Sequence, residues 1–332
     1  MLASIQKVLK VDPIEGADKI EKIKVLGWEL VAAKGEFKEG DICVYIEIDT
    51  VVPDKPAFEF LRKHNFRIKT IKLKGQISQG IALPFDLKYI PFKDYKIGDD
   101  VSELIGVEKY EKPIPLGMGG KIRRAGLPFG IPITDETRVQ SIPDIINELY
   151  GVEVYFTTKC DGTSATYAIK NEDYHVCSRN NSYFKDEKNV YWKISDKYQI
   201  EEQVKSSKKN IAIRGEICGP GIQNNKLKLK DHDLFVFDVL DLDSYEYYNY
   251  PEILQICHLM GLNMVPLDHI ITEFKYTLEE LLVLAKGLYK GTTNRREGIV
   301  GRPVSKKMIS ASNKGRMSFK VLNNDYLLKD EE

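Results

Sequence analysis

Lys159 stands where a lysine could act as a nucleophile, at the end of the alternating run "VEVYF" and its two threonines, directly before a turn. Asp161 and Gly162 follow it in "KCDG", and two hydroxyl residues come next. An amine that attacks phosphorus must first lose its proton, which at pH 7 costs about 4.6 kcal/mol for a lysine of ordinary pKa. A nearby acid raises that cost unless the acid holds a metal ion. Taken alone, Lys159 could equally be a solvated lysine at the end of a strand before a turn. A catalytic Lys159 predicts carboxylates that hold a divalent metal beside it, with Asp161 as one candidate.

Further residues that could serve such chemistry follow Lys159 at or near the ends of expected strands. In chain order they are Arg179 in "CSRN", Glu216 in "RGEICG", Phe235 and Phe237 in "LFVFDV", Glu297 in "EGIVGR" and Lys320 in "SFKVLN". Each has a plain structural explanation when taken alone: exposed charges at strand ends, or two rings on one face of a core strand. The functional interpretation depends on their order along the chain.

The elements that must position these residues can be predicted from alternation and turn signals. After residue 132 the expected strands are "SATYAI", "YHVCSR", "NIAIRGEICG", "DLFVFDVLDL", "REGIVGRP" and "MSFKVLN". Three helices are expected. One is capped by Ser141, one runs from Pro251 to about Gly261, and one is opened by Thr277 with Glu280 three residues on, the spacing of a capping box.

The first part of the chain has a different pattern. Residues 1–105 contain the strand-like runs "IEKIKVLGWELVAA", "DICVYIEID", "RIKTIKLKG" and "QGIALP", which are separated by short turn signals and predict a small OB-like β-barrel. Residues 106–131 are rich in Gly and Pro and contain the basic stretch "KIRR", which predicts a linker. A second domain is expected over residues 132–332, and the expected fold class is α+β.

Composition limits the function classes. The 332 residues carry 49 Lys plus Arg against 49 Asp plus Glu, so any basic binding face must be local. The five cysteines show no CxxC spacing, which argues against a zinc site or a disulfide framework. No signal-peptide core and no apolar run of transmembrane length is present in the sequence, which predicts an intracellular protein that does not span a membrane.

The ordered set from Arg138 to Lys320 resembles the covalent nucleotidyltransferases of the ligase and capping-enzyme superfamily. It is most similar to the ATP-dependent RNA ligases that carry an OB-like domain in front of the catalytic domain. Arg138 in "PITDETRVQS" and the N-terminal texts "IEGADKIEKIKVLGWELV" and "GDICVYIEID" add to this resemblance. The chain departs from the superfamily at Ser318, where a first lysine often stands, and Lys314 or Arg316 could compensate.

The resemblance implies an ATP-grasp-like adenylyltransferase domain of antiparallel sheets with flanking helices. It also implies three steps: Lys159 attacks the α-phosphorus of ATP and expels pyrophosphate, AMP moves to the 5′-phosphate of RNA, and a 3′-hydroxyl then displaces AMP. Phosphoryl transfer depends mainly on positioning and on neutralising charge, so Mg²⁺ or Mn²⁺ is the expected cofactor.

The same resemblance assigns roles to individual residues, each with its number in this chain. The residues expected to act in catalysis are Lys159, Lys320, Glu297 and Glu216, and these four are expected to bind ATP together with Arg179, Phe235 and Arg138. The residues expected to contact the RNA end are Ser164 and Arg138. The residues expected to bind the metal are Asp161, Glu216 and Glu297. Phe235 is expected to stack on adenine, although Phe237 lies on the same strand face.

Three alternatives share parts of this pattern: an mRNA capping guanylyltransferase, a DNA ligase, and a non-catalytic RNA-binding protein on the same fold. The expected partner is RNA with 3′-hydroxyl and 5′-phosphate ends in a nicked duplex, bound by a monomer. The basic stretches "KIRR", "KSSKK" and "KLKLK" could grip phosphates or could be solvated surface, and the three lysines of "KLKLK" would share one face of a strand. The N-terminal barrel could bind nucleic acid or serve as a scaffold.

Overall fold

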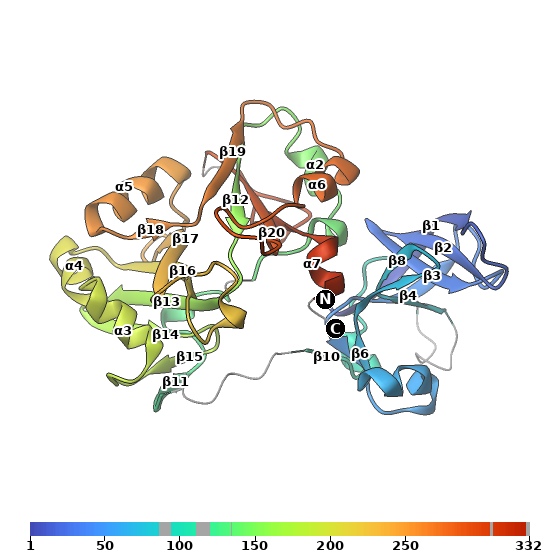
Figure 1. Ribbon diagram of the computed structural model, residues 1–332, viewed down its shortest axis with the longest axis horizontal. Helices are drawn as coiled ribbons and strands as arrows, with labels where there is room; N and C mark the ends of the chain where they lie inside the picture. Colours follow the sequence, from blue (N-terminus) through green and yellow to red (C-terminus); the bar gives the residue numbers. More distant parts are fainter. Residues whose placement is uncertain (86–93, 111–119, 134, 306–307, 330–332) are drawn as a thin grey trace. The chain divides into compact units, whose positions relative to one another are not determined.

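The structure, a computed structural model, describes residues 1–85, 94–110, 120–133, 135–305 and 308–329. The chain forms two compact units (Figure 1). The first unit comprises Met1–Lys112, Gln140–Pro143 and Leu327–Glu332, and the second comprises Pro113–Val139 and Asp144–Tyr326. The boundaries expected at residues 105 and 131 stay predictions, and part of the expected linker, residues 111–119, lies outside the described residues.

The first unit is built on a curled antiparallel sheet in the order β3-β2-β1-β4-β9. Its strands are β1 (Ala3–Pro13), β2 (Ile20–Val25), β3 (Trp28–Ala33), β4 (Ile42–Ile46) and β9 (Ile81–Pro84). A register shift in β1 between Val8 and Lys10 lets the strand leave β4 and pair with β2, which bends the sheet around a core that includes Trp28 and Tyr45. The half-barrel that results confirms the expected β-rich module.

Smaller elements complete this unit. They are the three-stranded sheet β10-β5-β6 (Glu108–Lys109, Thr50–Val51, Arg67–Ile68), the hairpin β7–β8 (Thr70–Leu73, Gln76–Gln79), the 3₁₀ helix η1 (Pro56–His64) and the short helix α1 (Ser102–Ile105). The two helical segments were not expected in a region that the sequence describes only as strands.

A seven-stranded sheet in the order β11-β15-β14-β13-β16-β17-β18 forms the larger part of the second unit. Its strands are β11 (Ile122–Ala125), β13 (Thr163–Lys170), β14 (Asp173–Cys177), β15 (Asn181–Tyr183), β16 (Ile211–Cys218), β17 (Asp233–Asp241) and β18 (Asn263–Met264). All neighbours pair antiparallel except β17 and β18. Strand β11 contains the last three residues of the "KIRR" stretch and lies within the expected linker.

Three helices cover one face of this sheet (Figure 1): α3 (Val190–Lys197), α4 (Ile200–Ser207) and α5 (Tyr250–Met260). Alternate residues of the central strands, such as Tyr167, Ile213 and Val236, pack with these helices in one buried core. The residues that alternate with them along these strands, among them Ser164 and Glu216, therefore lie on the opposite face of the sheet, which these helices do not cover.

A four-stranded antiparallel sheet in the order β19-β12-β20-β21 forms the rest of the second unit. Its strands are β19 (Leu267–Ile271), β12 (Val154–Lys159), β20 (Gly298–Pro303) and β21 (Phe319–Leu322), accompanied by helices α2 (Ile145–Glu148) and α6 (Leu278–Leu284). Helix α7 (Asn324–Lys329) begins in this unit, and from Leu327 it belongs to the first unit. Together the two units give the mixed α+β fold that was expected. No helix in the described ranges is long and apolar enough to cross a bilayer.

The capping signals were mostly informative. Asn249 and Thr277 open α5 and α6 with complete capping boxes, and Gly261 ends α5 in a left-handed conformation, so both of these helix predictions are confirmed. The helix predicted with Ser141 as its cap is wrong in detail. Its N-cap is Asp144, and the Ser141 hydroxyl instead donates to Glu47 Oε1 at 2.8 Å.

The stretch "KLKLK" is not a strand. Residues 226–230 follow the 3₁₀ turn η4 (Gln223–Asn225) as a loop, and Lys228 has a φ of 57°, which interrupts any extended run. The Asn225 side chain donates to the Leu229 carbonyl at 2.8 Å and accepts from the Leu229 amide at 3.1 Å, which closes the loop. Leu227 and Leu229 pack beside Phe235, so the alternating pattern reflects loop packing and not a strand face.

Candidate active site

The register of two strands brings two of the sequence-predicted site residues, Lys159 and Glu297, together. Strands β12 and β20 pair antiparallel with Lys159 opposite Gly298, so Glu297, one residue earlier, lies beside the end of β12. Lys159 Nζ donates to Glu297 Oε2 at 2.7 Å. This contact joins residues 138 positions apart in the chain.

The turn after Lys159 carries the chain from the four-stranded sheet into the seven-stranded one, where β13 begins at Thr163. Gly162 in this turn lies against β16, and a Cβ at this position would lie 2.3 Å from the Ile217 carbonyl oxygen. Only glycine permits this close approach of two backbones. Beyond the turn, Ser164 is the cross-strand partner of Glu216 and donates to Glu216 Oε2 at 3.0 Å.

The charges of these residues are strongly coupled. Burial alone would lower the pKa of Lys159, but the carboxylates of Glu297 and Glu216 outweigh it and hold that pKa above its usual range. Burial, together with the neighbouring Glu297 carboxylate, raises the pKa of Glu216 to about 7 even though Lys159 opposes the shift. Burial likewise raises the pKa of Glu297. In the absence of substrate, Lys159 therefore carries a protonated ammonium group. The positive charges nearby do not fully compensate the neighbouring carboxylates of Glu216 and Glu297, whose pKa values are raised.

Lys320 lies at the same site. It is the cross-strand partner of Val300 in β20 and forms a backbone bridge with Arg138, and its amide donates to the Thr137 carbonyl at 2.8 Å. Burial, together with the positive charges of Arg138 and Lys159, lowers the pKa of Lys320 to about 8, against the opposing effect of Asp135 and Glu297. The sequence-predicted residues Arg138 and Lys320 are thus brought together near Lys159.

Asp161 is held by two residues that were not assigned to the site. Tyr326 donates to Asp161 Oδ2 at 2.7 Å, and Lys226 Nζ lies 3.3 Å from the same oxygen and 3.9 Å from the centre of the Tyr326 ring. Within the part of the chain that the structure describes, no three His, Cys, Asp or Glu side chains are grouped closely enough to hold a metal ion by themselves. A metal at Asp161, Glu216 or Glu297 would need further oxygen ligands.

The two candidate adenine-stacking rings pack against the same apolar cluster. Phe235 is the cross-strand partner of Glu216, and Phe235 and Phe237 both pack in an apolar cluster with Cys160 and Cys218. Cys160 directly follows Lys159, so this cluster adjoins the predicted nucleophile. The predicted shared face of the two phenylalanines is confirmed, and the choice of Phe235 over Phe237 stays a prediction.

Arg179 contacts the site indirectly. Its guanidinium donates to Asp135 Oδ2 at 2.6 Å, and Asp135 in turn acts on the charge of Lys320. That Lys314 or Arg316 compensates for Ser318 stays a prediction. Arg316 has other ionic partners. It is held in a buried network by Glu136 and Asp238, whereas Lys314 is exposed.

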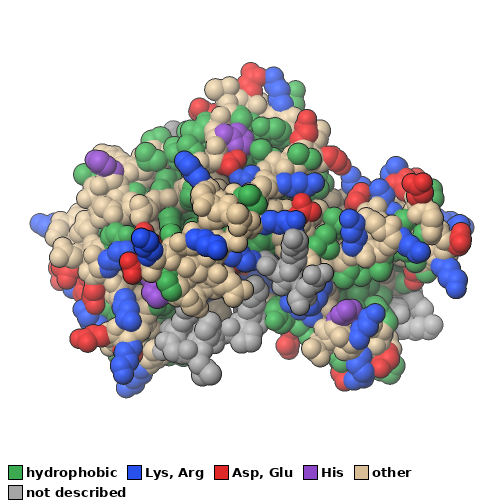
Figure 2. Space-filling model, viewed as in Figure 1, with side chains coloured by type: hydrophobic (Ala, Val, Ile, Leu, Met, Phe, Trp, Pro, Cys, Tyr) green, Lys and Arg blue, Asp and Glu red, His purple; other side chains and the backbone are tan. Residues whose placement is uncertain are grey.

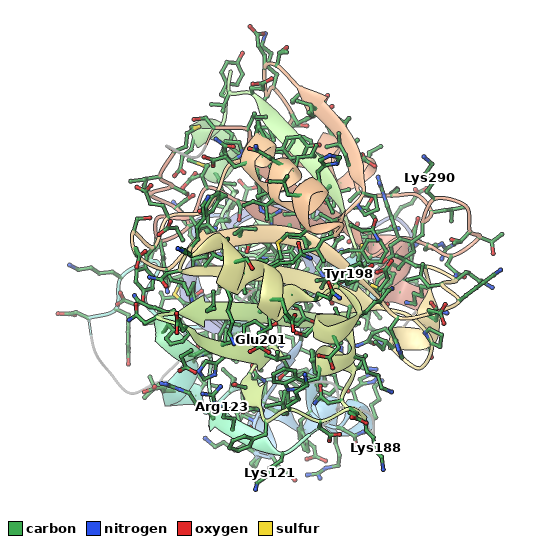
Figure 3. All side chains as sticks on the ribbon, turned by 90° about the vertical axis from the view of Figure 1, so that its left-hand side faces the viewer. Lys121, Arg123, Lys188, Tyr198, Glu201 and Lys290 are labelled. Atoms are coloured by element: carbon green, nitrogen blue, oxygen red, sulfur yellow. The ribbon has the colours of Figure 1, made fainter. Side chains whose placement is uncertain are left out.

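The basic stretches behave differently from one another. Lys121 and Arg123 of "KIRR" lie at the lower edge of the second unit in Figure 3, where Arg123 donates to the Tyr174 carbonyl at 2.8 Å and pairs with Asp173 at 2.7 Å. Lys205 of "KSSKK" pairs with Glu201 on α4 at 2.6 Å. On the face shown in Figure 2, basic and acidic side chains are interspersed.

Comparison with known proteins follows the same division as the fold. An OB-fold domain family matches residues 2–85, and the RNA ligase family matches residues 152–322, the region that contains Lys159, Glu216, Glu297 and Lys320. The chain belongs to the RNA ligase family. A search against curated proteins gave no significant match.

Solved structures of an RNA ligase from Naegleria gruberi are similar to this family member over its whole length. A lysine-to-alanine mutant with ATP and Mn shares 33% identity, covers 98% of each chain and gives a TM-score of 0.89. The same enzyme with PPi gives 33% identity, 98% and 97% coverage and a TM-score of 0.89. A glutamate-to-alanine mutant with AMP and Mn gives 33% identity, 98% coverage of each chain and a TM-score of 0.88.

Sequence reasoning missed one further residue at the centre of this RNA ligase site. Tyr289 is buried, its hydroxyl donates to the Lys159 carbonyl at 3.0 Å, and it accepts from the Glu297 amide at 3.1 Å. It therefore ties the backbones of the lysine and the glutamate together. Tyr289 lies in "GLYKG", a turn-like text that carries no sign of such a contact, so only the three-dimensional structure identifies it.

Proposed function

We propose that the protein is an ATP-dependent RNA ligase that joins RNA 3′-hydroxyl and 5′-phosphate ends through a lysine-linked adenylate. The observation that carries this proposal is the 2.7 Å contact of Lys159 with Glu297, with the protonatable Glu216 nearby on β16 of the seven-stranded sheet. A lysine held among buried carboxylates at the end of a strand suits a nucleophile whose charge is controlled by its neighbours.

In the first step, Lys159 Nζ loses its proton and bonds to the α-phosphorus of ATP, while the bond from that phosphorus to the bridging oxygen breaks and pyrophosphate leaves. Glu297 Oε2, at 2.7 Å, is an acceptor within reach of the lysine proton. AMP then moves to the RNA 5′-phosphate, and the 3′-hydroxyl displaces it. Lys320 and Arg138 supply positive charge for the phosphates, and Phe235 stacks on adenine.

A divalent metal fits this set of donors. Glu216, Glu297 and Asp161 offer hard carboxylate oxygens, and the raised pKa values of Glu216 and Glu297 indicate that a cation is needed to balance them. Carboxylates that bind Mg²⁺ together with substrate phosphates do not need to form a complete cage. The metal, Mg²⁺ or Mn²⁺, would neutralise phosphate charge and favour the neutral amine.

The remaining assignments belong to the same proposal. The OB-like domain of residues 1–105 and the linker of residues 106–131 precede an adenylation domain of residues 132–332, and the enzyme acts as a monomer on nicked duplexes. Ser164 and Arg138 contact the RNA end and Arg179 the nucleotide. The five cysteines are all free and buried, which suits a reducing intracellular compartment.

The test is covalent labelling. The purified protein is incubated with Mg²⁺ and either α-³²P-ATP or α-³²P-GTP and then resolved by denaturing electrophoresis. We expect label from ATP, and none on Lys159→Ala, because alanine offers no nucleophile. Label on Lys159→Ala would contradict the proposed nucleophile, and preference for GTP would favour a guanylyltransferase.

A further inference from the structure

A buried network of charged side chains adjoins the site, and Glu136 is at its centre. Glu136 Oε1 accepts from Arg302 and from Arg316, each at 2.7 Å, and Glu136 Oε2 accepts from the Ser318 hydroxyl. Arg316 also donates to Asp238 Oδ2 at 2.8 Å. The network therefore links the segment before Arg138 with β17, β20 and the start of β21.

Glu136 carries a full negative charge in this network. Its side chain is 7% exposed, and burial alone would raise its pKa, but Arg316 and Arg302 lower the pKa to about 2. A buried carboxylate shared by two guanidinium groups is geometrically demanding, because every partner must keep its place for the charges to be compensated.

The network leads directly to two of the proposed phosphate-binding residues. Glu136 lies two residues before Arg138, and Ser318 lies two residues before Lys320. Between them, the Lys320 amide donates to the Thr137 carbonyl at 2.8 Å, and the Thr137 hydroxyl donates to Asn313 Oδ1 at 2.8 Å. Each residue of the segment 136–138 therefore has a hydrogen-bonding or bridge partner in or directly before β21.

We infer that Glu136 is a positioning residue for adenylyl transfer, which fixes Arg138 and Lys320 at the phosphate site through Arg302, Arg316 and Ser318. This inference rests on the proposed function. Ser318, which stands where a first lysine is expected, and the nearby Arg316 are used to anchor the strand and not to contact phosphate. Small displacements of positioning groups are costly for phosphoryl transfer, which depends on alignment.

The first experiment compares Glu136→Gln with wild type in the full chain, by the single-turnover rate of lysine adenylylation. We expect the maximal rate to fall about 10- to 100-fold, while the ATP concentration at half-maximal rate changes less than about threefold. Glu148→Gln is the matched control, because Glu148 accepts from the Ser312 amide at 2.9 Å and so holds the same loop without touching the Glu136 segment. It should retain the wild-type rate.

The second experiment separates positioning from general loss of structure. If Glu136 acts through Arg138, Glu136→Gln should cost less than about threefold in an Arg138→Ala background. An equal loss of adenylylation rate on Glu136→Gln in the wild-type and Arg138→Ala backgrounds would overturn the inference. A folded Glu136→Gln protein with a rate within about twofold of wild type would also overturn it. Thermal unfolding shows whether each variant is folded.

A milder variant keeps the test decisive if Glu136→Gln does not fold. Ser318→Ala removes the hydrogen bond to Glu136 Oε2 and the one that the Ser318 hydroxyl accepts from Arg316 Nε at 3.0 Å, and leaves both arginine contacts to Glu136 in place. The same cycle with Arg138→Ala then applies, and additive losses would reject the inference. Absence of any adenylate on the wild-type protein would instead reject the proposed function itself.

Discussion

Lys159 is held in the charge state opposite to the one that attack requires. The carboxylates of Glu297 and Glu216 raise its pKa, so the resting enzyme keeps an ammonium group in place. Under the proposed mechanism, the neutral amine forms only when other positive charge reaches these carboxylates. The sequence alone pointed to this conflict, since an acid beside a lysine nucleophile makes sense only if the acid has another partner. Tyr289, Tyr326 and Glu136 could not be predicted, because their partners lie 130 to 182 positions away in the chain.

The pKa of Glu216 gives a testable pH dependence for the metal-free protein. Because that pKa is raised to about 7, the folded state binds a proton more tightly than the unfolded state, and stability falls as pH rises from 4.5 towards 7. The loss reaches at most about 3 kcal/mol. In EDTA, we expect urea unfolding to show that Glu216→Gln gains stability relative to wild type over this range.

Glu201→Gln is the control for this measurement, because Glu201 lies on α4, where it pairs with Lys205. Its stability should follow the wild-type curve across the same pH range. Parallel curves for wild type and Glu216→Gln would show that Glu216 does not titrate in the predicted window.

At the scale of elements, strand register does most of the work of assembling the site. Pairing of β12 with β20 places Lys159 beside Glu297, and pairing of β13 with β16 places Ser164 beside Glu216. The alternation of apolar and polar residues predicted these strands. It could not predict which strands are neighbours, because strand pairing depends on contacts between segments that are distant in the sequence. Helices α3 and α4 were not expected, since no capping box marks their starts: α3 is capped by Asn189 alone, and α4 begins after Gln199 without a side-chain cap.

The Gly162 turn offers a test at this scale. In Gly162→Ala, the new Cβ would meet the Ile217 carbonyl, a backbone atom that cannot rotate away, so the turn or β16 must move. We expect about 1–3 kcal/mol lower stability and a fall of about 100-fold in lysine adenylylation, because Lys159 lies at the end of the strand before the turn. Thermal unfolding and single-turnover labelling measure the two effects.

Gly151→Ala is the matched control for the Gly162 variant. Gly151 has a φ of 77° but no atom near its hypothetical Cβ, so the substitution costs only backbone strain of about 1 kcal/mol. It should leave the adenylylation rate unchanged. An active Gly162→Ala protein with normal stability would show that the close approach to β16 is not needed.

At the scale of the whole molecule, the proposal predicts a preference for RNA over DNA at the 3′-hydroxyl side of a nick. Two nicked duplexes that differ only in ribose or deoxyribose at the last few nucleotides before the 3′-hydroxyl can be compared under single-turnover conditions. We expect faster sealing of the ribose nick, because an RNA ligase can read the 2′-hydroxyl and the local A-form geometry. Equal rates on both duplexes would favour the DNA ligase alternative, even if Lys159 is adenylylated.

The division of the chain into units has a consequence for biosynthesis. Gln140–Pro143 belongs to the first unit, where the Gln140 carbonyl accepts from the Gly27 amide at 2.9 Å, and Leu327 packs against the same core. When residues 1–112 have emerged from the ribosome, two segments of the first unit are therefore still missing. Nearly all of the second unit is synthesised before the later of these segments, which begins at Leu327. Folding during translation cannot proceed strictly one unit after the other, and the first unit reaches its final contacts only after the adenylation site has been synthesised.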